Sequence, residues 1–479
     1  MLIEGSDSYG DETPITAFAT SLGRSALTLI RCSGRGALEL ASGIFSKPEK
    51  LLNAPGNTVV HGWIAAAGEK IDEVLVSVFR APKSYTGEDG LDISCHGGGA
   101  AGQKVIGVLR AAGFRDALPG EFTFRAFMNG KLDLTRSESV MELVAARTDT
   151  GRRHAIYRLS GALENEINTL KKMLIEVLAA AEIFLDYSED EIDADAGEAA
   201  GRLPGRPQAL QALARLKTLA ASWQRERIYQ EGVLAAIAGR PNAGKSSLFN
   251  LLLKEERSIV TEIPGTTRDW IEAWVSIEGI PVRLADTAGL RDSADPVEKI
   301  GVKRSRELLE EAELILYLID GSEGITGEDR LFFSEFEKDG GDRRESQSRR
   351  LLILWNKADI APIPESAAAC GPVIISAKTG EGIPELTRAI TGALGEAAKS
   401  TPGTDSPQNA ALGSARQKNL VDAAVAALEG ALSLADREEP LDLIAPLLRE
   451  AVNALGEITG EISTADILEE MFSRFCVGK

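Results

Sequence analysis

The chain has 479 residues, of which 53 are lysine or arginine and 72 are aspartate or glutamate, giving a formal net charge of −19. This length predicts two to four domains, and the acidic balance argues against a protein that coats nucleic acid or anionic lipid through bulk charge. Apolar residues make up 44% and charged residues 26%, which excludes a disordered or fibrous chain.

No apolar run approaches the roughly 18 residues that a membrane-spanning helix needs, and the first residues lack the basic and then apolar stretches of a signal peptide. The cysteines are widely scattered, at Cys32, Cys95, Cys370 and Cys476. This spacing fits neither a disulfide framework nor a zinc site and is typical of a reducing compartment. We therefore expect a soluble, cytoplasmic, multidomain protein that does not bind membranes.

The first part of the chain alternates short strand-like apolar runs with glycine and proline. Residues 37–45 and 103–112 have helical patterns instead. This mixture predicts a compact α+β domain over residues 1–126. The expected strands cover residues 15–19, 26–30, 74–79 and 91–95.

Apolar residues then recur every three or four positions, which places them on one stripe of a helix. The first stripe contains Leu159, Leu163, Ile167, Leu170, Leu174 and Val177, and the second contains Leu210, Leu213, Leu216 and Leu219. Helical periodicity returns after a linker at residues 401–408. We therefore expect one discontinuous all-helical domain made of residues 127–228 and 398–479.

Between the two helical segments, continuous apolar strands alternate with helices, which predicts a parallel sheet covered on both faces. An α/β domain of residues 229–397 is thus inserted into the helical domain, as is tolerated where the ends of an insert lie close together. The polar stretch 337–350 is expected to be a surface loop. The expected strands cover residues 233–238, 282–285, 314–319, 351–355 and 373–375.

Residues 239–246 (GRPNAGKS) match the phosphate-binding pattern G-x-x-x-x-G-K-[ST] directly after the first of these strands. Its glycines allow a tight loop whose N–H groups surround phosphates at a helix N-terminus. Lys245 would reach the β- and γ-phosphates, and Ser246 would ligate Mg²⁺. The residues of this segment that we assign to the nucleotide are Asn242, Ala243, Gly244, Lys245, Ser246 and Ser247.

Three further motifs follow in order, each at the end of a later strand. Asp286-Thr287-Ala288-Gly289 can hold Mg²⁺ through water and sense the γ-phosphate. Asn356-Lys357-Ala358-Asp359 offers a carboxylate that accepts both N–H donors of guanine, and Ser376-Ala377-Lys378 can close over the base. Four motifs in this order, at the carboxyl ends of strands, predict a Ras-like P-loop GTPase domain.

The residue after the second motif departs from the Ras pattern. Ras-like enzymes have a glutamine there that orients the attacking water, whereas this chain has Leu290. Hydrolysis must then depend on another group. Asp292, Asp295 and Glu298 are the nearby candidates.

The segment Thr261–Asp269 is the expected switch region, in which Thr267 would contact Mg²⁺ and the γ-phosphate. The side-chain oxygen of Asn242, together with backbone oxygens of this segment, could bind a monovalent cation that neutralises charge as an arginine finger does. Alternatively, Asn242 only braces the phosphate loop. The segment residues assigned to the nucleotide are Thr261, Glu262, Ile263, Pro264, Gly265, Thr266 and Thr267.

Taken together, the chain resembles the MnmE (TrmE) family of tRNA-modifying GTPases from about residue 11 to residue 479. Outside the GTPase motifs, the resemblance rests on residues 81–89 (APKSYTGED), 119–123 (PGEFT), 126–134 (AFMNGKLDL) and 475–479 (FCVGK). The chain departs from the family pattern in an N-terminal extension and in the stretch 337–350, and neither touches a motif.

The resemblance implies K⁺-activated GTP hydrolysis when two GTPase domains pair. The implied K⁺ ligands are Asn242, Thr261, Ile263 and Thr266, and those of Mg²⁺ are Ser246 and Thr267. It also implies that Glu298, which lies 12 residues after Asp286 (298 − 286), positions the attacking water. The residues alone leave Asp292 and Asp295 open, and they equally allow Glu298 to be only a helix cap.

The resemblance also implies an N-terminal domain that dimerises and, like tetrahydrofolate-binding aminomethyltransferases, binds a one-carbon folate in its 5,10-methylene or 5-formyl form. The implied contacts are Arg31, Glu88, Lys131 and Lys479. A carboxylate suits the amide-bearing edge of a pterin, and basic side chains suit the carboxylates of its glutamyl tail. From the residues alone, Arg31 is a surface charge at a strand end and Glu88 is a turn residue.

Residues 463–466 (STAD) predict the start of a helix that ends near Phe475. Such a helix would deliver Cys476 and Lys479 to another surface, which could be the folate site. We therefore expect Cys476 to be a functional thiol of unassigned role.

The implied function is GTP hydrolysis coupled to the addition of a one-carbon-derived aminomethyl or carboxymethylaminomethyl group at C5 of the wobble uridine of certain tRNAs. The implied partners are a second copy of the chain, tRNA, and the FAD-containing MnmG in a heterotetramer, with FAD on that partner. One alternative is an RNA-binding regulatory GTPase of ribosome assembly without modification chemistry, but no basic KH-type domain follows residue 401. Another is a GTP-switched dimerising scaffold.

Overall fold

The computed structural model describes residues 9–21, 23–186, 203–255, 271–286, 307–340, 349–361, 363–364, 371–394 and 410–478. The chain divides into two compact units. The first comprises Met1–Met141, Arg158–Leu216 and Asn419–Lys479, and the second comprises Glu142–Tyr157 and Lys217–Lys418. This division is coarser than the three domains expected from the sequence, whose boundaries stay predictions.

The first unit contains a six-stranded sheet. Its strands are β1 (Ile15–Phe18), β2 (Leu27–Ser33), β3 (Thr58–Ala66), β4 (Glu69–Phe79), β5 (Gly90–His96) and β6 (Arg115–Asp116). The order is β3-β4-β5-β2-β1-β6, and all pairs are antiparallel except β1 with β6. The four strands expected from the sequence are confirmed, and β3 and β6 are additional.

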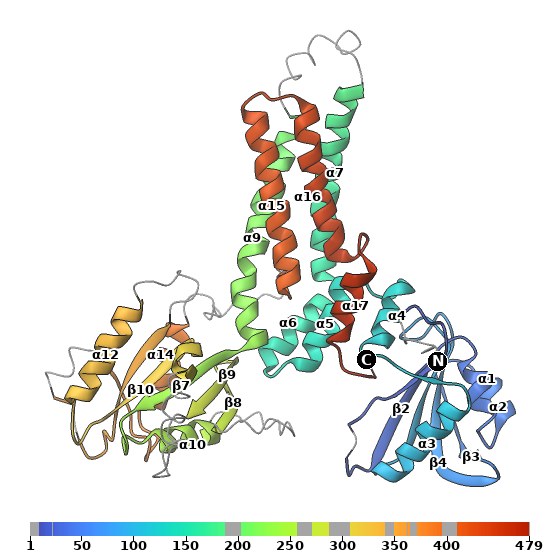
Figure 1. Cartoon of the computed structure of the whole chain (residues 1–479), viewed down its shortest axis with the longest axis horizontal. Coiled ribbons are helices and arrows are strands. Elements are labelled where there is room, and N and C mark those ends of the chain that lie inside the picture. The colour runs from blue at the N-terminus through green and yellow to red at the C-terminus, as the bar shows by residue number, and fades with distance from the viewer. Residues whose placement is uncertain are drawn as a thin grey trace, which may run out of the picture. The chain divides into compact units, whose positions relative to one another are not determined.

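Helices pack on one face of this sheet and enclose its core (Figure 1). These helices are α1 (Ala37–Ser42), α2 (Pro48–Leu52) and α3 (Gly99–Ala111). Strand alternation explains the core, because Val74, Val76 and Val78 of β4 are at most 2% exposed while Glu73 and Leu75 point outward. The first helix ends at Ser42 rather than at residue 45, and the chain beyond it forms a bridge from Phe45 to Ile64 of β3.

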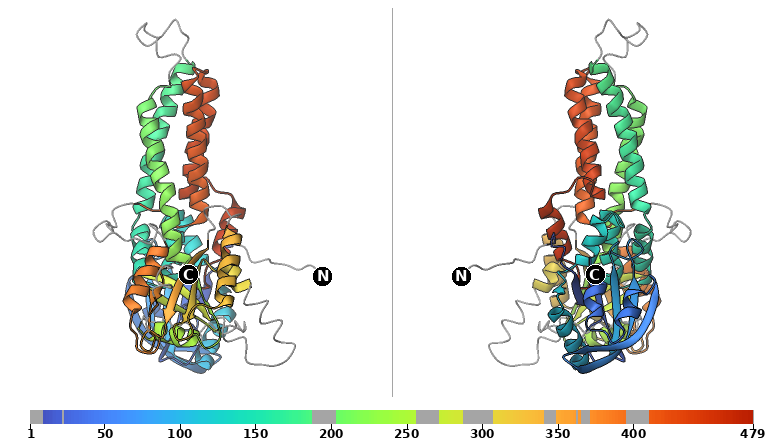
Figure 2. Two further views of the ribbon diagram at one scale, coloured as in Figure 1. Left: turned by 90° about the vertical axis from the view of Figure 1, so that its left-hand side faces the viewer. Right: turned by 90° about the vertical axis from the view of Figure 1, so that its right-hand side faces the viewer.

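Long helices lie side by side in the same unit (Figures 1 and 2). They are tied together by ion pairs, including Arg215 with Glu166 and Arg206 with Asp436, each at 2.6 Å. The helices after the sheet that lie wholly in this unit are α4 (Glu121–Met128), α7 (Ala162–Asp186), α16 (Leu441–Thr459) and α17 (Ala465–Ser473). The helices α5 (Leu134–Ala145), α9 (Arg206–Glu231) and α15 (Ala415–Asp436) are divided between the two units, and α6 (Asp149–Leu159) belongs mainly to the second.

The first predicted helical stripe is buried, since Leu163, Ile167, Leu170 and Leu174 of α7 are all 0% exposed. The second stripe was placed wrongly at its start. Leu210 is 41% exposed, whereas Ala209, Ala212, Leu216 and Leu219 of α9 are buried. The buried stripe therefore begins at the alanines Ala209 and Ala212, which a count of leucines alone misses.

The second unit contains a sheet of six strands. They are β7 (Val233–Gly239), β8 (Ile271–Ile277), β9 (Ile280–Asp286), β10 (Leu314–Asp320), β11 (Arg350–Asn356) and β12 (Val373–Ile374). The order is β12-β11-β10-β7-β9-β8. The five expected strands are present and parallel, but β8 runs antiparallel to β9 at one edge. A two-residue turn with positive φ at Glu278 and Gly279 joins these strands, and so tight a turn can only connect antiparallel neighbours.

Helices cover both faces of this second sheet, as expected for buried strands. Those helices are α10 (Lys245–Glu255), α12 (Gly327–Gly340) and α14 (Ile383–Ala393). Alternate residues of β10 enter the core under α10 and α14 and the core under α12. Residues 337–340, expected in a loop, belong to the last turn of α12, since Glu337 and Lys338 are good helix formers.

None of the helices in the described ranges is long and apolar enough to cross a membrane.

Candidate functional site: a nucleotide site and an N-terminal pocket

The phosphate-binding loop lies between the end of β7 and the start of α10, as the motif predicted. Two of its glycines have positive φ, +136° at Gly239 and +99° at Gly244. A Cβ atom at Gly239 would lie 2.4 Å from the Leu318 carbonyl oxygen, and one at Gly244 would lie 2.2 Å from Asn356 Nδ2. The loop therefore packs directly against the neighbouring strand end and against the third motif, and only glycine fits these two positions.

The Lys245 ammonium folds back over this loop. Its Nζ donates to the carbonyl oxygens of Gly239 at 2.9 Å and Arg240 at 2.8 Å. The side chain thus lies across the loop opening at the N-terminus of α10, where phosphate oxygens bind in sites of this kind.

Ser246 and Asp286 meet at the carboxyl edge of the sheet. Because β9 pairs with β7, the last residue of β9 lies beside the phosphate loop, and Ser246 Oγ donates to Asp286 Oδ2 at 2.9 Å. A hydroxyl and a carboxylate oxygen that converge at a phosphate loop are the hard ligands that Mg²⁺ prefers. The residues present therefore fit a magnesium site.

The base-reading motifs are bonded to the phosphate loop. Asn356 Nδ2 donates to the Ala243 carbonyl oxygen at 2.6 Å, and Asn356 Oδ1 accepts the Ala377 N–H at 2.9 Å. Ser376 Oγ donates to Asp359 Oδ1 at 2.8 Å and so orients the carboxylate that would read guanine. The structure therefore brings the first, third and fourth motifs together.

Asn242 projects from the phosphate loop with its side chain exposed and its backbone at φ +63°. Asparagine tolerates this left-handed conformation better than most residues. The other predicted contacts, namely Thr261, Glu262, Ile263, Pro264, Gly265, Thr266, Thr267, Thr287, Ala288, Gly289 and Glu298, lie outside the described residues, as does Lys479.

Sequence reasoning missed the polar residues that form ion pairs with the nucleotide motifs. Asp320, at the end of β10, pairs with Lys357, and Arg240 pairs with Glu323 and Asp329. Burial opposes ionisation of Asp320, yet hydrogen bonds from Lys357 and Ser322 hold the pKa of its carboxyl below the ordinary value. Of these residues, only Asp320 could have been found from the sequence, because it ends a predicted strand as the nucleotide motifs do.

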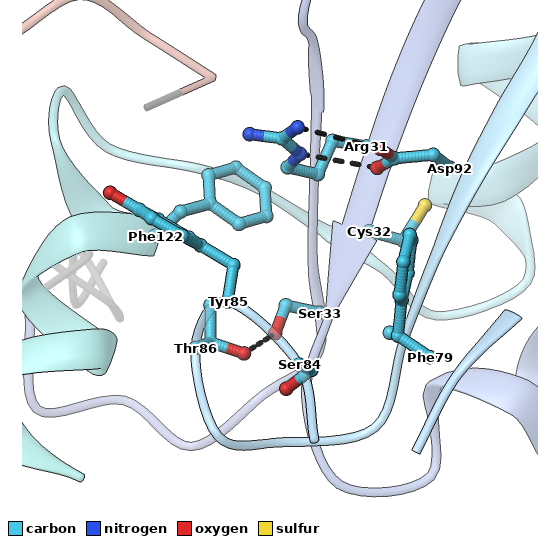
Figure 3. Close-up of a pocket in the computed structure, with 10 residues that line it drawn as sticks. Arg31, Cys32, Ser33, Phe79, Ser84, Tyr85, Thr86, Asp92 and Phe122 are labelled. Carbon is cyan, nitrogen blue, oxygen red and sulfur yellow. Dashed lines mark hydrogen bonds and ion pairs between the residues drawn. The ribbon is translucent and has the colours of Figure 1, made fainter. Parts of the chain in front are cut away.

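A second concave site lies in the N-terminal part of the first unit (Figure 3). It encloses about 370 Å³, part of it open to solvent, and Arg31, Tyr85 and Phe122 are among the residues that line it. The Arg31 guanidinium carbon lies 6.0 Å from the centre of the Tyr85 ring and 5.9 Å from that of Phe122. Asp92 holds the guanidinium through an ion pair of 3.1 Å from Nε. The site combines aromatic walls with one positioned cation.

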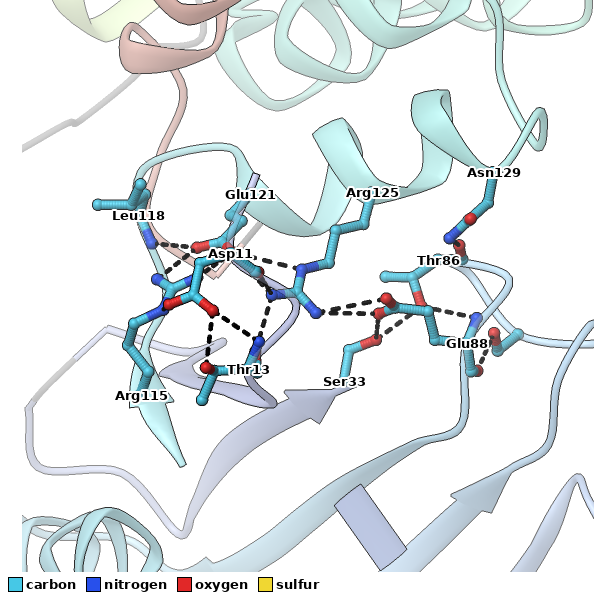
Figure 4. Close-up of polar contacts among 11 residues, drawn as sticks. Asp11, Thr13, Ser33, Thr86, Glu88, Arg115, Leu118, Glu121, Arg125 and Asn129 are labelled. Atoms are coloured by element: carbon cyan, nitrogen blue, oxygen red, sulfur yellow. Dashed lines mark hydrogen bonds and ion pairs between the residues drawn. The ribbon is translucent and has the colours of Figure 1, made fainter. Parts of the chain in front are cut away.

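Glu88 belongs to a neighbouring ion network rather than to the pocket lining (Figure 4). Arg125 Nη1 lies 3.3 Å from both Glu88 oxygens, and Ser33 Oγ donates to Glu88 Oε2 at 2.8 Å. Arg125 in turn pairs with Glu121, whose side chain is fully buried. Since Ser33 also lines the pocket, Glu88 lies one hydrogen bond from it. Sequence reasoning missed Arg125 and Asp92, for which no motif gave a signal.

Lys131 lies at the loop that carries Glu88. Its Nζ donates to the Pro82 carbonyl oxygen at 2.9 Å, and its side chain passes close to Gly87. The structure therefore brings Lys131 and Glu88 to one loop and Arg31 to the adjoining pocket.

The C-terminal segment reaches this pocket through Gly478. The helix α17 begins at Ala465 with Thr464 at its N-cap position, although the Thr464 side chain makes no cap hydrogen bond. Beyond it, the Cys476 carbonyl oxygen accepts the Gly120 N–H at 3.3 Å, and Arg31 Nη1 donates to the Gly478 carbonyl oxygen at 3.4 Å. The Cys476 side chain is exposed.

The phosphate loop, the Ser246–Asp286 pair and the base-reading loops define a P-loop GTPase class of protein. Two family models match the chain, the MnmE helical domain over residues 134–476 and the GTP-binding protein TrmE N-terminus over residues 14–131. The chain therefore belongs to the MnmE (TrmE) family.

Relatives match over almost the whole chain. The tRNA modification GTPase MnmE of Treponema denticola is 44% identical over 486 residues and covers 99% of each chain. That of Carboxydothermus hydrogenoformans is 39% identical over 480 residues, covering 98% of this chain and 100% of the relative.

Solved structures match only part of the chain. A variant of Aquifex aeolicus Era bound to GDP and AlF₄⁻ is 25% identical, covering 41% of this chain and 66% of its own, with a TM-score of 0.28. The G domain of Thermotoga maritima FeoB is 27% identical, covering 35% and 99%, with a TM-score of 0.25.

Proposed function

We propose that this chain is a tRNA modification GTPase that couples GTP hydrolysis to the addition of a one-carbon-derived group at C5 of a wobble uridine. The group is aminomethyl or carboxymethylaminomethyl. The observation that carries the proposal is the convergence of three nucleotide motifs on one phosphate loop, in a chain whose full-length relatives are named tRNA modification GTPases.

The GTPase part of the proposal uses residues 229–397 as the inserted domain. Lys245 and the loop N–H groups bind the phosphates, and Asp359 selects guanine. Ser246 and Thr267 hold Mg²⁺, which neutralises the charge that develops on the phosphoryl oxygens. Since Leu290 cannot orient water, Glu298 takes that role and acts mainly in the transition state.

A potassium ion bound by Asn242, Thr261, Ile263 and Thr266 supplies the positive charge that an arginine finger supplies in other GTPases. The exposed position of the Asn242 side chain at the edge of the loop supports this role. Two GTPase domains of a homodimer pair to complete the site.

The folate part of the proposal uses residues 1–126. The pocket residues fit a one-carbon tetrahydrofolate, because aromatic walls suit a flat ring and the Arg31 guanidinium suits a carboxylate. A folate in its 5,10-methylene or 5-formyl form supplies the one-carbon unit when it is bound. Arg31, Glu88, Lys131 and Lys479 would hold it, and Asp92 keeps the Arg31 guanidinium in place.

The remaining chemistry requires partners. A FAD-containing MnmG-type protein supplies redox chemistry and most of the tRNA contact, which explains how a chain of net charge −19 serves an RNA reaction. The discontinuous helical domain, residues 127–228 and 398–479, connects the two active parts. The activity is cytoplasmic, where thiols stay reduced and tRNA is available.

Folate titration of the full-length chain tests the proposal against a purely regulatory GTPase. We expect 5-formyltetrahydrofolate to bind the wild type and to bind Arg31→Ala at least about tenfold more weakly, because a charge-assisted contact is lost. Arg35→Ala, four residues along and exposed, is the matched control and should bind like the wild type. If the wild-type chain binds no folate, the proposed one-carbon transfer is wrong and only the GTPase activity remains.

A further inference from the structure

The carboxylate of Asp320 lies next to the base-reading loop, residues Asn356–Asp359. Asp320 belongs to none of the four nucleotide motifs. It is the last residue of β10, pairs in register with Asn356, and is 4% exposed. Its side chain pairs with Lys357 Nζ and accepts the Ser322 N–H at 3.0 Å. One buried carboxylate therefore fixes both a turn and the lysine of the base-reading loop.

Lys357 is also constrained at its backbone. Its backbone has φ +67°, a left-handed conformation that costs a lysine about 1–2 kcal/mol. In this conformation the Ala358 N–H donates to the Ile375 carbonyl oxygen at 3.2 Å. With Nζ anchored at Asp320, the four-carbon stem of Lys357 cannot rotate freely.

The turn that follows Asp320 is anchored on its other side by the phosphate loop. Arg240 Nη1 pairs with Glu323 at 2.6 Å, and Arg240 Nη2 donates to the Gly324 carbonyl oxygen at 3.1 Å. Backbone N–H groups of Glu323 and Gly324 donate to the Asp320 carbonyl oxygen at 3.1 and 2.9 Å. The segment Asp320–Gly324 therefore connects the phosphate loop with the base-reading loop.

The far end of this connection is held by a second buried carboxylate. Asp329 is 0% exposed, lies 3.2 Å from Arg240 Nε, and accepts hydrogen bonds from Tyr317 Oη at 2.8 Å and the Thr326 N–H at 2.7 Å. Such a fully bonded buried carboxylate keeps Arg240 in one position. Movement of the turn would break several of these bonds at once.

We propose that Asp320 is a positioning residue for guanine binding: through its ion pair it holds the side chain of Lys357, in the same loop as Asp359, and thereby sets the affinity for guanine nucleotides. The side-chain bonds of Asp320 lead to the base-reading loop and to its own turn. Its loss therefore weakens binding of GTP and GDP alike and leaves the chemical step intact. This inference rests on the nucleotide site of the proposed function and is independent of the folate and tRNA chemistry.

The test measures nucleotide affinity and turnover on the full-length chain. Asp320→Asn keeps the shape of the side chain and its hydrogen bond to the turn, but it removes the charge that pairs with Lys357. We expect GDP affinity and the KM for GTP to worsen roughly 10- to 100-fold, as for loss of a buried charged partner, with kcat at saturating GTP within about twofold. Ser334→Ala removes a hydroxyl of α12 that donates to the Leu331 carbonyl oxygen rather than to Asp320, and it is the matched control with wild-type affinity.

A second variant keeps the test independent of whether Asp320→Asn folds. Lys357→Met retains a long stem without the ammonium and should show a similar loss of affinity. The double variant should then be no weaker than either single variant, because both remove one interaction.

Three outcomes would overturn the inference: unchanged affinity in Asp320→Asn, additive losses in the double variant, or a fall in kcat equal to the fall in affinity. If the wild type binds no guanine nucleotide, the proposed function fails as well. If the wild type binds guanine nucleotides and Asp320→Asn binds them with the same affinity, this inference fails and the proposed function stands.

Discussion

Ser246 Oγ donates a hydrogen bond of 2.9 Å to Asp286 Oδ2, joining the first turn of α10 to the last residue of β9. The two residues are 40 positions apart in the sequence, and the parallel pairing of β7 with β9 brings them together. The Ser246 hydroxyl and the Asp286 carboxylate therefore meet at the edge of the phosphate loop, where a divalent cation would be held by the hydroxyl directly and by the carboxylate through water.

Removal of the Ser246 hydroxyl should weaken Mg²⁺ use. In Ser246→Ala we expect the Mg²⁺ concentration for half-maximal GTP hydrolysis to rise about tenfold or more, since a direct ligand is lost. A Mg²⁺ titration of the hydrolysis rate measures this. Ser334→Ala, which removes an exposed hydroxyl of α12, is the control. An unchanged Mg²⁺ dependence in Ser246→Ala would show that the hydroxyl is no ligand.

The left-handed backbone of Asn242 decides how the potassium site should be tested. Alanine would add backbone strain at φ +63°, whereas glycine adopts this conformation freely. We expect GTP hydrolysis by the wild type to be faster in K⁺ than in Na⁺, and we expect Asn242→Gly to lose most of this difference. In other GTPases, an arginine that supplies the same charge raises the rate by a factor on the order of 10³. Asn242→Asp keeps a side-chain oxygen and should retain the preference for K⁺.

The rate of GTP hydrolysis in matched K⁺ and Na⁺ buffers measures this effect. If Asn242→Gly kept the wild-type ratio of the two rates, Asn242 would only brace the loop.

Substitution of Gly478 should disturb the N-terminal pocket, because its carbonyl oxygen accepts a hydrogen bond from Arg31. Its φ is +93°, and an added Cβ would lie 2.4 Å from the Phe18 carbonyl oxygen, so Gly478→Ala must shift the tail away from Arg31. We expect the affinity for 5-formyltetrahydrofolate to fall several-fold, roughly what loss of one hydrogen bond and added strain predict. Val477→Ala, at a side chain 54% exposed, is the control. Isothermal titration measures the affinity of both variants for 5-formyltetrahydrofolate. Equal affinities of Gly478→Ala and Val477→Ala would show that the tail has no part in folate binding.

The cysteines should differ sharply in reactivity. Burial raises the pKa of Cys32 to about 12 and that of Cys95 to about 11, so at pH 8 roughly 10⁻³ or less of each is thiolate. Cys476 is exposed. In a Cys370→Ser background, chosen because Cys370 lies outside the described residues, one thiol should react rapidly with a disulfide dye. Peptide mapping should place the label on Cys476. Rapid labelling of Cys32 or Cys95 in the folded chain would contradict the burial described above.

The sequence predicted the parts of the site that lie close together along the chain. The GRPNAGKS loop and the strand before it form one local unit, so spacing alone predicted the positions of Lys245 and Ser246. The strands of the second sheet were equally clear because each is a continuous apolar run. The antiparallel β8 was missed because an edge strand carries a weaker apolar pattern than a buried one.

The supporting residues could not be predicted because their partners are distant in sequence and carry no motif. Arg31 contacts Gly478 across 447 positions, and Asp320 meets Lys357 across 37. Only the fold determines such pairs. The same holds for α9, where Ala209 rather than Leu210 faces the core, because tertiary packing selected among several stripes of similar hydrophobicity.

The most direct test of the central claim is the nucleoside composition of tRNA from cells that lack this protein. We predict that the C5-modified wobble uridine disappears and returns on expression of the wild-type chain, but not of Lys245→Ala or Arg31→Ala. Liquid chromatography with mass spectrometry of digested tRNA measures it. Unchanged wobble uridines in the deletion strain would contradict a role in tRNA modification, even if the purified chain hydrolysed GTP.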